Sequence, residues 1–323
     1  MNTQRKPGGL RALFGGIGAA LQWRLLLLWA LLLLLPSLIA ALPLWSWLSG
    51  KFDHTLQADA IAAGFHDIAM SDVLSQLGDV GNLLTVSSIV GIVVALLLGP
   101  WLTGMTIASI RAGHRLGFAA LLQQGLGEYG RMLRMSIWML FPVGVAIALG
   151  SMAMKMADKH TEQAILQSQV DSAGNIALVV LALLFVLAHA SVEAGRGVLG
   201  ANPALRSVLR AWWRGLKLLL RRPLATLVVY LGTAVLGYGL ALGFIALRVQ
   251  TSAASWLGFA GGLLLTQLIV VALAWGRNAR LYGMANLARH EQLHHESRAV
   301  SGRKRRWSWR RKADPAAQDA TAA

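Results

Sequence analysis

The stretch LLLLWALLLLLPSLIAALPLWSWL, residues 25–48, decides the fold class of this chain. Its 24 residues contain no charged side chain, and an α-helix needs about 20 apolar residues to cross the hydrocarbon core of a bilayer. The run is longer than the apolar region of a secretory signal peptide, and no convincing cleavage site follows it. The stretch therefore predicts a first transmembrane helix that is not removed.

Five further apolar blocks of similar length follow, at residues 83–110, 135–154, 176–195, 224–247 and 256–275. The chain is 56% apolar and only 14% charged, whereas soluble domains contain about 25% charged residues. These features predict an all-α, polytopic membrane protein with six transmembrane helices. There is no cysteine, which excludes disulfides, thiolate zinc sites and cysteine nucleophiles.

The net charge of +16 is distributed unevenly between the segments that connect the blocks. Alternate segments, including both ends of the chain, hold 26 of the 30 Lys and Arg residues, and the other segments hold 8 of the 14 Asp and Glu residues. Because basic loops stay in the cytoplasm, both termini are predicted to be cytoplasmic. The excess of Arg over Lys favours a GC-rich bacterial genome and hence an inner-membrane location.

The same charges indicate how the chain is organised. Residues 1–24 form a basic N-terminal segment, residues 25–282 form the transmembrane domain, and residues 283–323 form a basic cytoplasmic tail. The acidic segment 49–82 has the apolar spacing of one or two short amphipathic helices on the periplasmic side. The tail ends in ADPAAQDATAA, a composition typical of disorder.

Between the fourth and fifth blocks, NPALRSVLRAWWRGLKLLLRRP, residues 202–223, has the pattern of an amphipathic helix. Asn202 is predicted to cap it, with Pro203 in the first turn. An apolar face with a basic face opposite is typical of a helix in the membrane plane that binds anionic headgroups, although a partner helix would suit the same pattern. The predicted lipid contacts are Arg206, Arg210, Trp212, Trp213, Arg214 and Lys217.

A weaker amphipathic pattern follows the second block at residues 113–135, which raises the hypothesis of a threefold repeat. The second, fourth and sixth blocks end at Arg111, Arg196 and Arg277, and each is followed by an amphipathic stretch.

In the fifth block, Gly232, Gly239 and Gly243 lie on one stripe of the predicted helix. The last two form a G-x-x-x-G pair, which is typical of closely packed membrane helices. We therefore expect another helix backbone to contact this stripe.

Ionisable side chains enter an apolar block only in LAHASVEAGRG, where His189, Glu193 and Arg196 share one helix face. Charges are costly in lipid, so these groups should face the bundle interior and pair with one another, with Arg111 or with Arg277. One hypothesis is a proton-coupled or ligand-binding polar site. The alternative is a structural clamp in which Glu193 neutralises the arginines and His189 donates to a backbone carbonyl.

The segment HEQLH, residues 290–294, matches the zinc-binding H-E-x-x-H signature through His290, Glu291 and His294. A catalytic site needs a third protein ligand, and the remaining tail offers only Glu296 and two aspartates in its disorder-like end. We therefore expect neither a catalytic metal nor another cofactor. A metal-dependent membrane hydrolase remains the alternative.

Close to the end, RKRRWSWRRK, residues 303–312, interleaves Trp307 and Trp309 with seven basic residues. Such runs bind anionic lipid or nucleic acid. Because this one follows a transmembrane helix on the predicted cytoplasmic side, we expect lipid contacts and no nucleic acid.

Two stretches resemble a loose group of uncharacterised six-helix bacterial inner-membrane proteins: GFAALLQQGLGEYGRMLRMSIW, residues 117–138, and AGRGVLGANPALRSVLRAWWRGLKLLLRRP, residues 194–223. They are also distantly similar to the membrane domains of some glycerophosphodiester phosphodiesterases. The resemblance implies a fold and no activity.

These observations favour a non-enzymatic, permease-like or lipid-interacting component of the envelope. Besides the metal-dependent hydrolase, a scaffold is a further alternative, in which the basic interfacial helices recruit an unidentified membrane-protein partner.

Overall fold

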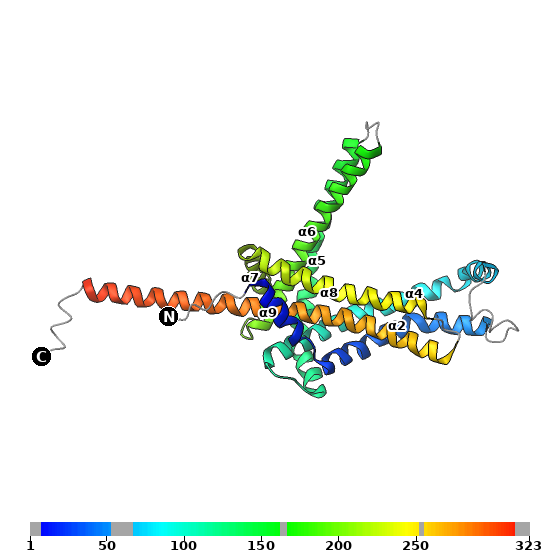
Figure 1. Ribbon diagram of the computed structural model, residues 1–323, viewed down its shortest axis with the longest axis horizontal. Helices are drawn as coiled ribbons and strands as arrows, with labels where there is room; N and C mark the ends of the chain where they lie inside the picture. The colour runs from blue at the N-terminus through cyan, green and yellow to red at the C-terminus, as the bar shows by residue number, and fades with distance from the viewer. Residues whose placement is uncertain (1–7, 53–66, 162–166, 252–254, 314–323) are drawn as a thin grey trace.

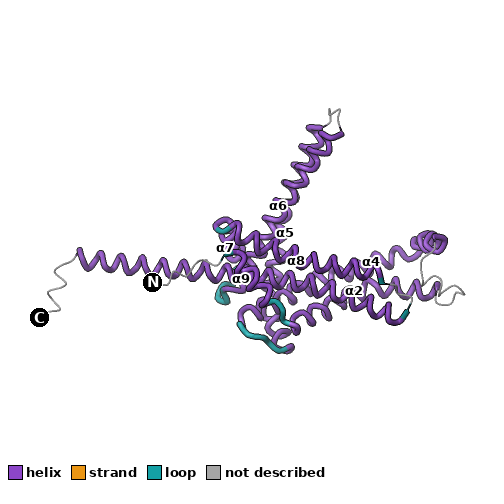
Figure 2. Tube along the Cα trace, viewed as in Figure 1, coloured by secondary structure: helices purple, strands orange, loops and turns teal. Residues whose placement is uncertain are grey.

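The computed structural model describes residues 8–52, 67–161, 167–251 and 255–313 of the 323-residue chain. It is 93% helical, and the described ranges contain no strand (Figure 2). Six of the helices are long and apolar enough to cross a membrane. The predicted all-α fold with six candidate transmembrane helices is therefore confirmed.

Each predicted apolar block lies inside one longer helix. The helices are α1 (Gly9–Ala19), α2 (Trp23–Phe52), α4 (Asp67–Ala112), α5 (Phe118–Thr161), α6 (Gln167–Ala201), α7 (Val208–Arg221), α8 (Pro223–Gln250) and α9 (Trp256–Ala313). In the acidic segment 49–82, residues 53–66 lie outside the described part, and residues 67–82 form the beginning of α4. Of the tail, residues 283–313 continue α9, and residues 314–323 are not described.

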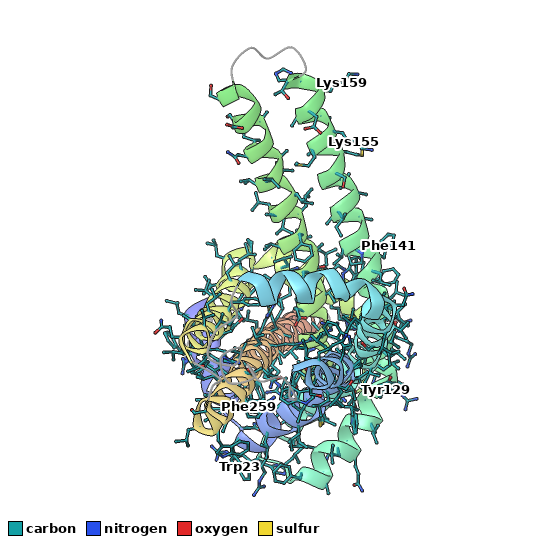
Figure 3. The ribbon with its side chains drawn as sticks, turned by 90° about the vertical axis from the view of Figure 1, so that its right-hand side faces the viewer. Trp23, Tyr129, Phe141, Lys155, Lys159 and Phe259 are labelled. Carbon is teal, nitrogen blue, oxygen red and sulfur yellow. The ribbon has the colours of Figure 1, made fainter. Side chains whose placement is uncertain are left out.

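The long helices form three antiparallel pairs, α2 with α4, α5 with α6, and α8 with α9. The first and third pairs run alongside each other, whereas the α5–α6 pair diverges from them at a wide angle (Figure 1). In the view at 90°, the same pair stands apart, with Lys155 and Lys159 towards its far end (Figure 3). Large apolar side chains are exposed along all six helices, as expected for surfaces that face lipid.

The main hydrophobic core lies at one end of the bundle, where α1, α4, α6, α7, α8 and α9 all contribute buried side chains. We call this the basic end, because Arg111, Arg196, Arg277 and Arg280 lie here. Burial continues along α9 as far as Ala288, so packing with the bundle extends beyond residue 282.

Two short helical segments cross long helices at the basic end through glycine. A Cβ added at Gly215 of α7 would lie 2.3 Å from the backbone nitrogen of Gly195 in α6. A Cβ added at Gly104 of α4 would lie 2.6 Å from the carbonyl oxygen of Gly125, in the first turns of α5. At both crossings the backbones are close enough that only glycine fits without a shift, as is typical of closely packed membrane helices.

The third crossing of this kind is made by α1. A Cβ added at Gly16 would lie 2.6 Å from the carbonyl oxygen of Ala279 in α9. The stretch after the sixth block, which was predicted to be amphipathic, is part of the same helix as that block, since α9 continues unbroken to Ala313. The threefold repeat stays a hypothesis.

The predicted close approach at Gly239 and Gly243 is wrong, since no heavy atom of the described chain outside their own helix lies within 4 Å of a Cβ added at either position. The helix face of α8 that packs on α9 carries Gly237 instead, whose added Cβ would lie 3.0 Å from the Cα of Gly276. Small residues occupy more than one face of α8, and the G-x-x-x-G spacing does not show which face meets protein.

The amphipathic helix α7 begins later than predicted. Its N-cap is Ser207, whose hydroxyl accepts a hydrogen bond from the Arg210 backbone nitrogen at 3.4 Å. Asn202 does not cap it, because α6 continues to Ala201. The Asn202 side chain instead accepts from the backbone nitrogen of Ala204 at 3.1 Å, which stabilises the turn before α7.

The two adjacent tryptophans of α7 have different surroundings. Trp212 lies against Trp138 of α5, with ring centroids 5.5 Å apart, and its indole nitrogen donates to the Ser191 hydroxyl at 3.0 Å. The side chain of Trp213 is 52% exposed. Of the predicted lipid contacts in residues 202–223, Trp212 therefore packs into the bundle. The exposed residues that stay candidates are Arg206, just before α7, and Arg210, Trp213, Arg214 and Lys217 on it.

Candidate functional site

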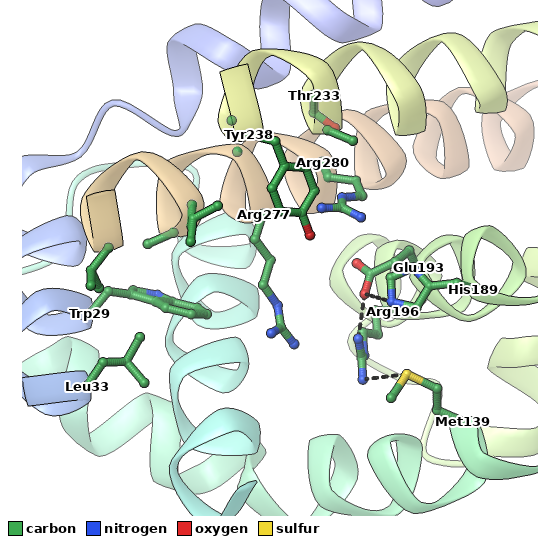
Figure 4. Close-up of a pocket in the computed structure, with 16 residues that line it drawn as sticks. Trp29, Leu33, Met139, His189, Glu193, Arg196, Thr233, Tyr238, Arg277 and Arg280 are labelled. Carbon is green, nitrogen blue, oxygen red and sulfur yellow. Dashed lines mark hydrogen bonds and ion pairs between the residues drawn. The ribbon is translucent and has the colours of Figure 1, made fainter. Parts of the chain in front are cut away.

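A cavity of about 390 Å³ lies where α6 meets α8 and α9 (Figure 4). Its charged lining residues come from α6 and α9, its tyrosine from α8, and further apolar residues from α2 and α5. The side chains that carry the argument below are Trp29, Met139, His189, Glu193, Arg196, Tyr238, Arg277 and Arg280.

The three ionisable residues of α6 lie together, as their spacing predicted. Glu193 and Arg196 are buried, with only 1% and 2% of their surface exposed. An Arg196 Nη donates to a Glu193 carboxylate oxygen at 2.5 Å, and the His189 Nε2 lies 3.9 Å from the same oxygen. The other Arg196 Nη donates to the Ser136 hydroxyl at 3.3 Å. Glu193 therefore neutralises Arg196 directly, as the clamp hypothesis required.

His189 has a different partner from the one that the clamp hypothesis assigned. Its Nδ1 shares a hydrogen bond of 2.7 Å with the Tyr230 hydroxyl of α8, and no backbone carbonyl is its partner among the described hydrogen bonds. Its imidazole also stacks on Phe185 of the preceding turn, with centroids 5.9 Å apart. The contact with Tyr230 ties α6 to α8 at the edge of the cavity.

We expect Tyr230→Phe to lower the free energy of unfolding by about 1 kcal/mol, because it removes one partly buried hydrogen bond. Thermal unfolding of the purified protein measures the change. Tyr238→Phe is the matched control on the same helix, since the Tyr238 side chain is exposed, and its effect should stay within about 0.5 kcal/mol. Equal stability of Tyr230→Phe and wild type would show that the tie between α6 and α8 contributes nothing.

Two arginines of α9 reach the same cavity. An Arg277 Nη donates to the Thr103 hydroxyl of α4 at 3.3 Å, and its guanidinium lies 5.6 Å from the centroid of the Trp29 ring. The guanidinium of Arg280 lies 4.9 Å from the Tyr230 ring centroid. Figure 4 shows Arg277 extending into the space between α9 and the ion pair of α6.

The charges around the cavity do not balance. Three guanidinium groups face one carboxylate, that of Glu193. The Nε atoms of Arg196, Arg277 and Arg280 are buried and have no hydrogen-bond partner within the described part of the chain, and the second Glu193 oxygen is in the same situation. Because buried cations are costly without a counter-charge, the cavity attracts anions.

No known protein family, curated protein or solved structure matches this chain. The resemblance to six-helix inner-membrane proteins therefore stays an expectation. Any function has to be argued from the geometry of the site itself.

Arg111, a predicted partner of the α6 triad, lies in a separate cluster. It forms an ion pair with Glu128 of α5, which also binds Arg131 at 2.5 Å. Its other Nη donates to the carbonyl oxygen of Leu199 at 2.6 Å. Through these contacts of its two Nη atoms, Arg111 holds α4, α5 and α6 together, and it is not among the residues that line the cavity.

The HEQLH segment lies within α9, where Glu291 forms ion pairs with two arginines near the end of α7. Its carboxylate oxygens lie 3.5 Å from an Arg221 Nη and 3.2 Å from the Arg222 Nε. Nowhere in the described residues do three His, Asp or Glu side chains gather to hold a metal ion. The side chains of His294, Trp307 and Trp309 lie outside the described part, so the predictions for the metal and for the lipid-binding tail stay untested.

The sequence argument missed Arg280 and both tyrosines of the site. Arg280 follows Arg277 by three positions, so the two share a helix face, and this spacing could have identified it. Tyr230 and Tyr238 lie in an apolar helix, and only the packing of α8 on α6 and α9 brings Tyr238 to the cavity and Tyr230 to His189.

Proposed function

We propose that this integral membrane protein is a non-enzymatic, permease-like or lipid-interacting component of a bacterial inner membrane, and that it binds an anionic ligand in the cavity between α6, α8 and α9. The observation that carries the proposal is the convergence of Arg196, Arg277 and Arg280 with a single carboxylate, Glu193. Charge balance, and not a catalytic motif, is the basis of the assignment.

The chemistry of the lining supports an anion carrying several acceptor oxygens. Guanidinium groups offer a planar array of donors that matches carboxylate and phosphate, and each keeps an unpartnered Nε here. Trp29, Met139 and apolar residues of α8 and α9 form much of the remaining wall, and apolar surroundings strengthen the attraction between ligand and arginines. Glu193 fixes Arg196 and leaves Arg277 and Arg280 to meet the ligand.

The orientation follows from the distribution of basic residues. Segments rich in Lys and Arg join the helices at the end that carries α1 and α7, and such segments remain in the cytoplasm. We place both termini there, which puts the cavity near the cytoplasmic surface of the membrane.

Contact with the membrane surface forms a second part of the proposal. On α7, the exposed apolar side chains Leu209, Trp213 and Leu220 lie along one face, at spacings of four and seven residues, with exposed arginines beside them. An amphipathic helix of this composition binds anionic headgroups. We propose lipids as its partner, and a membrane-protein partner as the alternative.

Binding of an anion should raise the thermal stability of the protein. Purified in a neutral detergent at constant ionic strength, the wild type should unfold at a higher temperature with inorganic phosphate or with a water-soluble, short-chain phosphatidylglycerol. A ligand at 100 times its dissociation constant adds about 2.7 kcal/mol. Arg277→Gln should abolish most of the shift.

The matched control is Arg134→Gln, because Arg134 is exposed on α5 and its Nε donates to the Gly130 carbonyl of its own helix at 2.9 Å. This variant should respond to anions like the wild type. If neither probe shifted the wild type, or if Arg277→Gln responded fully, the cavity would not be an anion site.

A further inference from the structure

The cavity has a charged end and an apolar end. The residues Glu193, Arg196 and Arg280 are buried at the charged end. Four apolar lining residues are more open to the surroundings: Leu273 is 39% exposed, and Leu33, Ala234 and Val270 are half-buried. A small inorganic anion would contact the arginines and leave this apolar lining uncovered.

The more open apolar lining residues belong to α2, α8 and α9. At the cavity, α6 is tied to α8 by the hydrogen bond between His189 and Tyr230. Farther along, the α5–α6 pair diverges from α8 and α9 (Figures 1 and 3). Large apolar side chains are exposed on both α6 and α8, among them Leu183 and Leu236. Exposed apolar side chains favour hydrocarbon over water as their surroundings.

The depth of the arginines suits a headgroup of one leaflet. Trp256, at the start of α9, lies 21 positions before Arg277, which corresponds to about 31 Å along a helix. This distance is close to the hydrocarbon thickness of a bilayer, about 30 Å. If Trp256 marks one boundary of the hydrocarbon core, then Arg277 lies at the opposite boundary, where lipid phosphates are found.

We infer that the ligand is an anionic membrane lipid, whose phosphate group meets Arg277 and Arg280 while its acyl chains lie along the exposed apolar lining of α8 and α9. The inference rests on the proposed anion site and adds the class of its ligand. The lipid reaches the site from the membrane, because these lining residues belong to helices that are long and apolar enough to span it. A free phosphate shares the headgroup chemistry but makes no use of the apolar lining.

The test compares three probes on the full-length protein in neutral detergent: phosphatidylglycerol, phosphatidylcholine and inorganic phosphate. Native mass spectrometry measures retained lipid, and thermal unfolding measures the stabilisation by each probe. We expect phosphatidylglycerol to bind about tenfold more tightly than phosphatidylcholine. A difference of this size is expected when the anionic lipid makes one more hydrogen bond with a charged group than the neutral lipid does. Arg277→Gln should remove this preference, and phosphate alone should stabilise the protein much less than phosphatidylglycerol.

A second variant tests the apolar lining without touching any arginine. Ala234→Phe fills part of the lining and should weaken binding of phosphatidylglycerol about tenfold, while the weak response to phosphate remains. Val235→Phe is its control, because Val235 is the exposed neighbouring residue outside the cavity.

The outcomes separate the two proposals. Equal stabilisation of the wild type by phosphate and phosphatidylglycerol would overturn the lipid inference and leave the anion site standing. Undiminished binding of phosphatidylglycerol by the Ala234→Phe variant would do the same. Equal binding of both lipids with no effect of Arg277→Gln would overturn the lipid inference as well, since it would indicate unspecific lipid contact. No response to any probe would overturn both.

Discussion

Glu193→Ala is expected to lower the free energy of unfolding by about 3–5 kcal/mol, the effect of removing one partner from a buried ion pair. The side chain is almost fully buried, and its carboxylate is the counter-charge for Arg196 at 2.5 Å. Without it, Arg196, Arg277 and Arg280 would face one another across the cavity with no negative group among the lining residues. Thermal or denaturant unfolding of purified protein measures the loss.

Two controls make the result specific. Glu291→Ala removes the ion pairs with Arg221 and Arg222, whose side chains are 52% and 13% exposed. Because these groups keep contact with solvent, the change should lower stability by about 1 kcal/mol. Glu193→Gln keeps the shape of the side chain and removes only the charge, so added anion should recover more stability in this variant than in the wild type. Should Glu193→Ala unfold like Glu291→Ala, the buried pair would not stabilise the bundle.

Gly215→Ala is expected to destabilise the protein by about 3 kcal/mol, at the upper end of the range for overpacking. The new Cβ would lie 2.3 Å from the Gly195 nitrogen and 2.7 Å from the Ala194 carbonyl carbon. Backbone atoms cannot move aside as a flexible side chain can, so α7 would have to shift away from α6. Hydrogen exchange of α7 amides, together with thermal unfolding, measures this loss of packing.

The matched control is Gly239→Ala in α8, where an added Cβ meets no described atom within 4 Å. Here alanine should leave stability unchanged or raise it by up to about 1 kcal/mol, because alanine favours the helix over glycine. A Gly215→Ala variant that matched Gly239→Ala would show that the crossing of α7 and α6 is looser than the structure has it.

Several features of the fold were predictable because they depend on composition along a single helix. The six spans follow from runs such as residues 25–48, since lipid selects for apolar length alone. The shared face of His189, Glu193 and Arg196 follows from helix periodicity, as does the amphipathic character of α7. These features require no knowledge of neighbouring helices.

Features that depend on which faces meet were predicted less well. The glycine pair Gly239 and Gly243 has the spacing of a packing motif, yet it is Gly237 that contacts α9. The packing of α1 on α9, at the other end of the chain, was not predicted at all. In a membrane, an apolar helix face can contact lipid tails or another helix equally well. Sequence alone therefore does not distinguish the faces that pack on protein from those that contact lipid.

By itself, the sequence determined that the chain is helical, that it has six segments able to cross a membrane, and that Glu193 and Arg196 share a helix face. Helix length and periodicity are local properties, and the hydrogen bonds of each helix are satisfied within it. Only the tertiary structure decided that Arg277 and Arg280 join them around a cavity, and that Tyr230 binds His189. Side chains on different helices converge only after packing, because the close glycine contacts set where one helix crosses another.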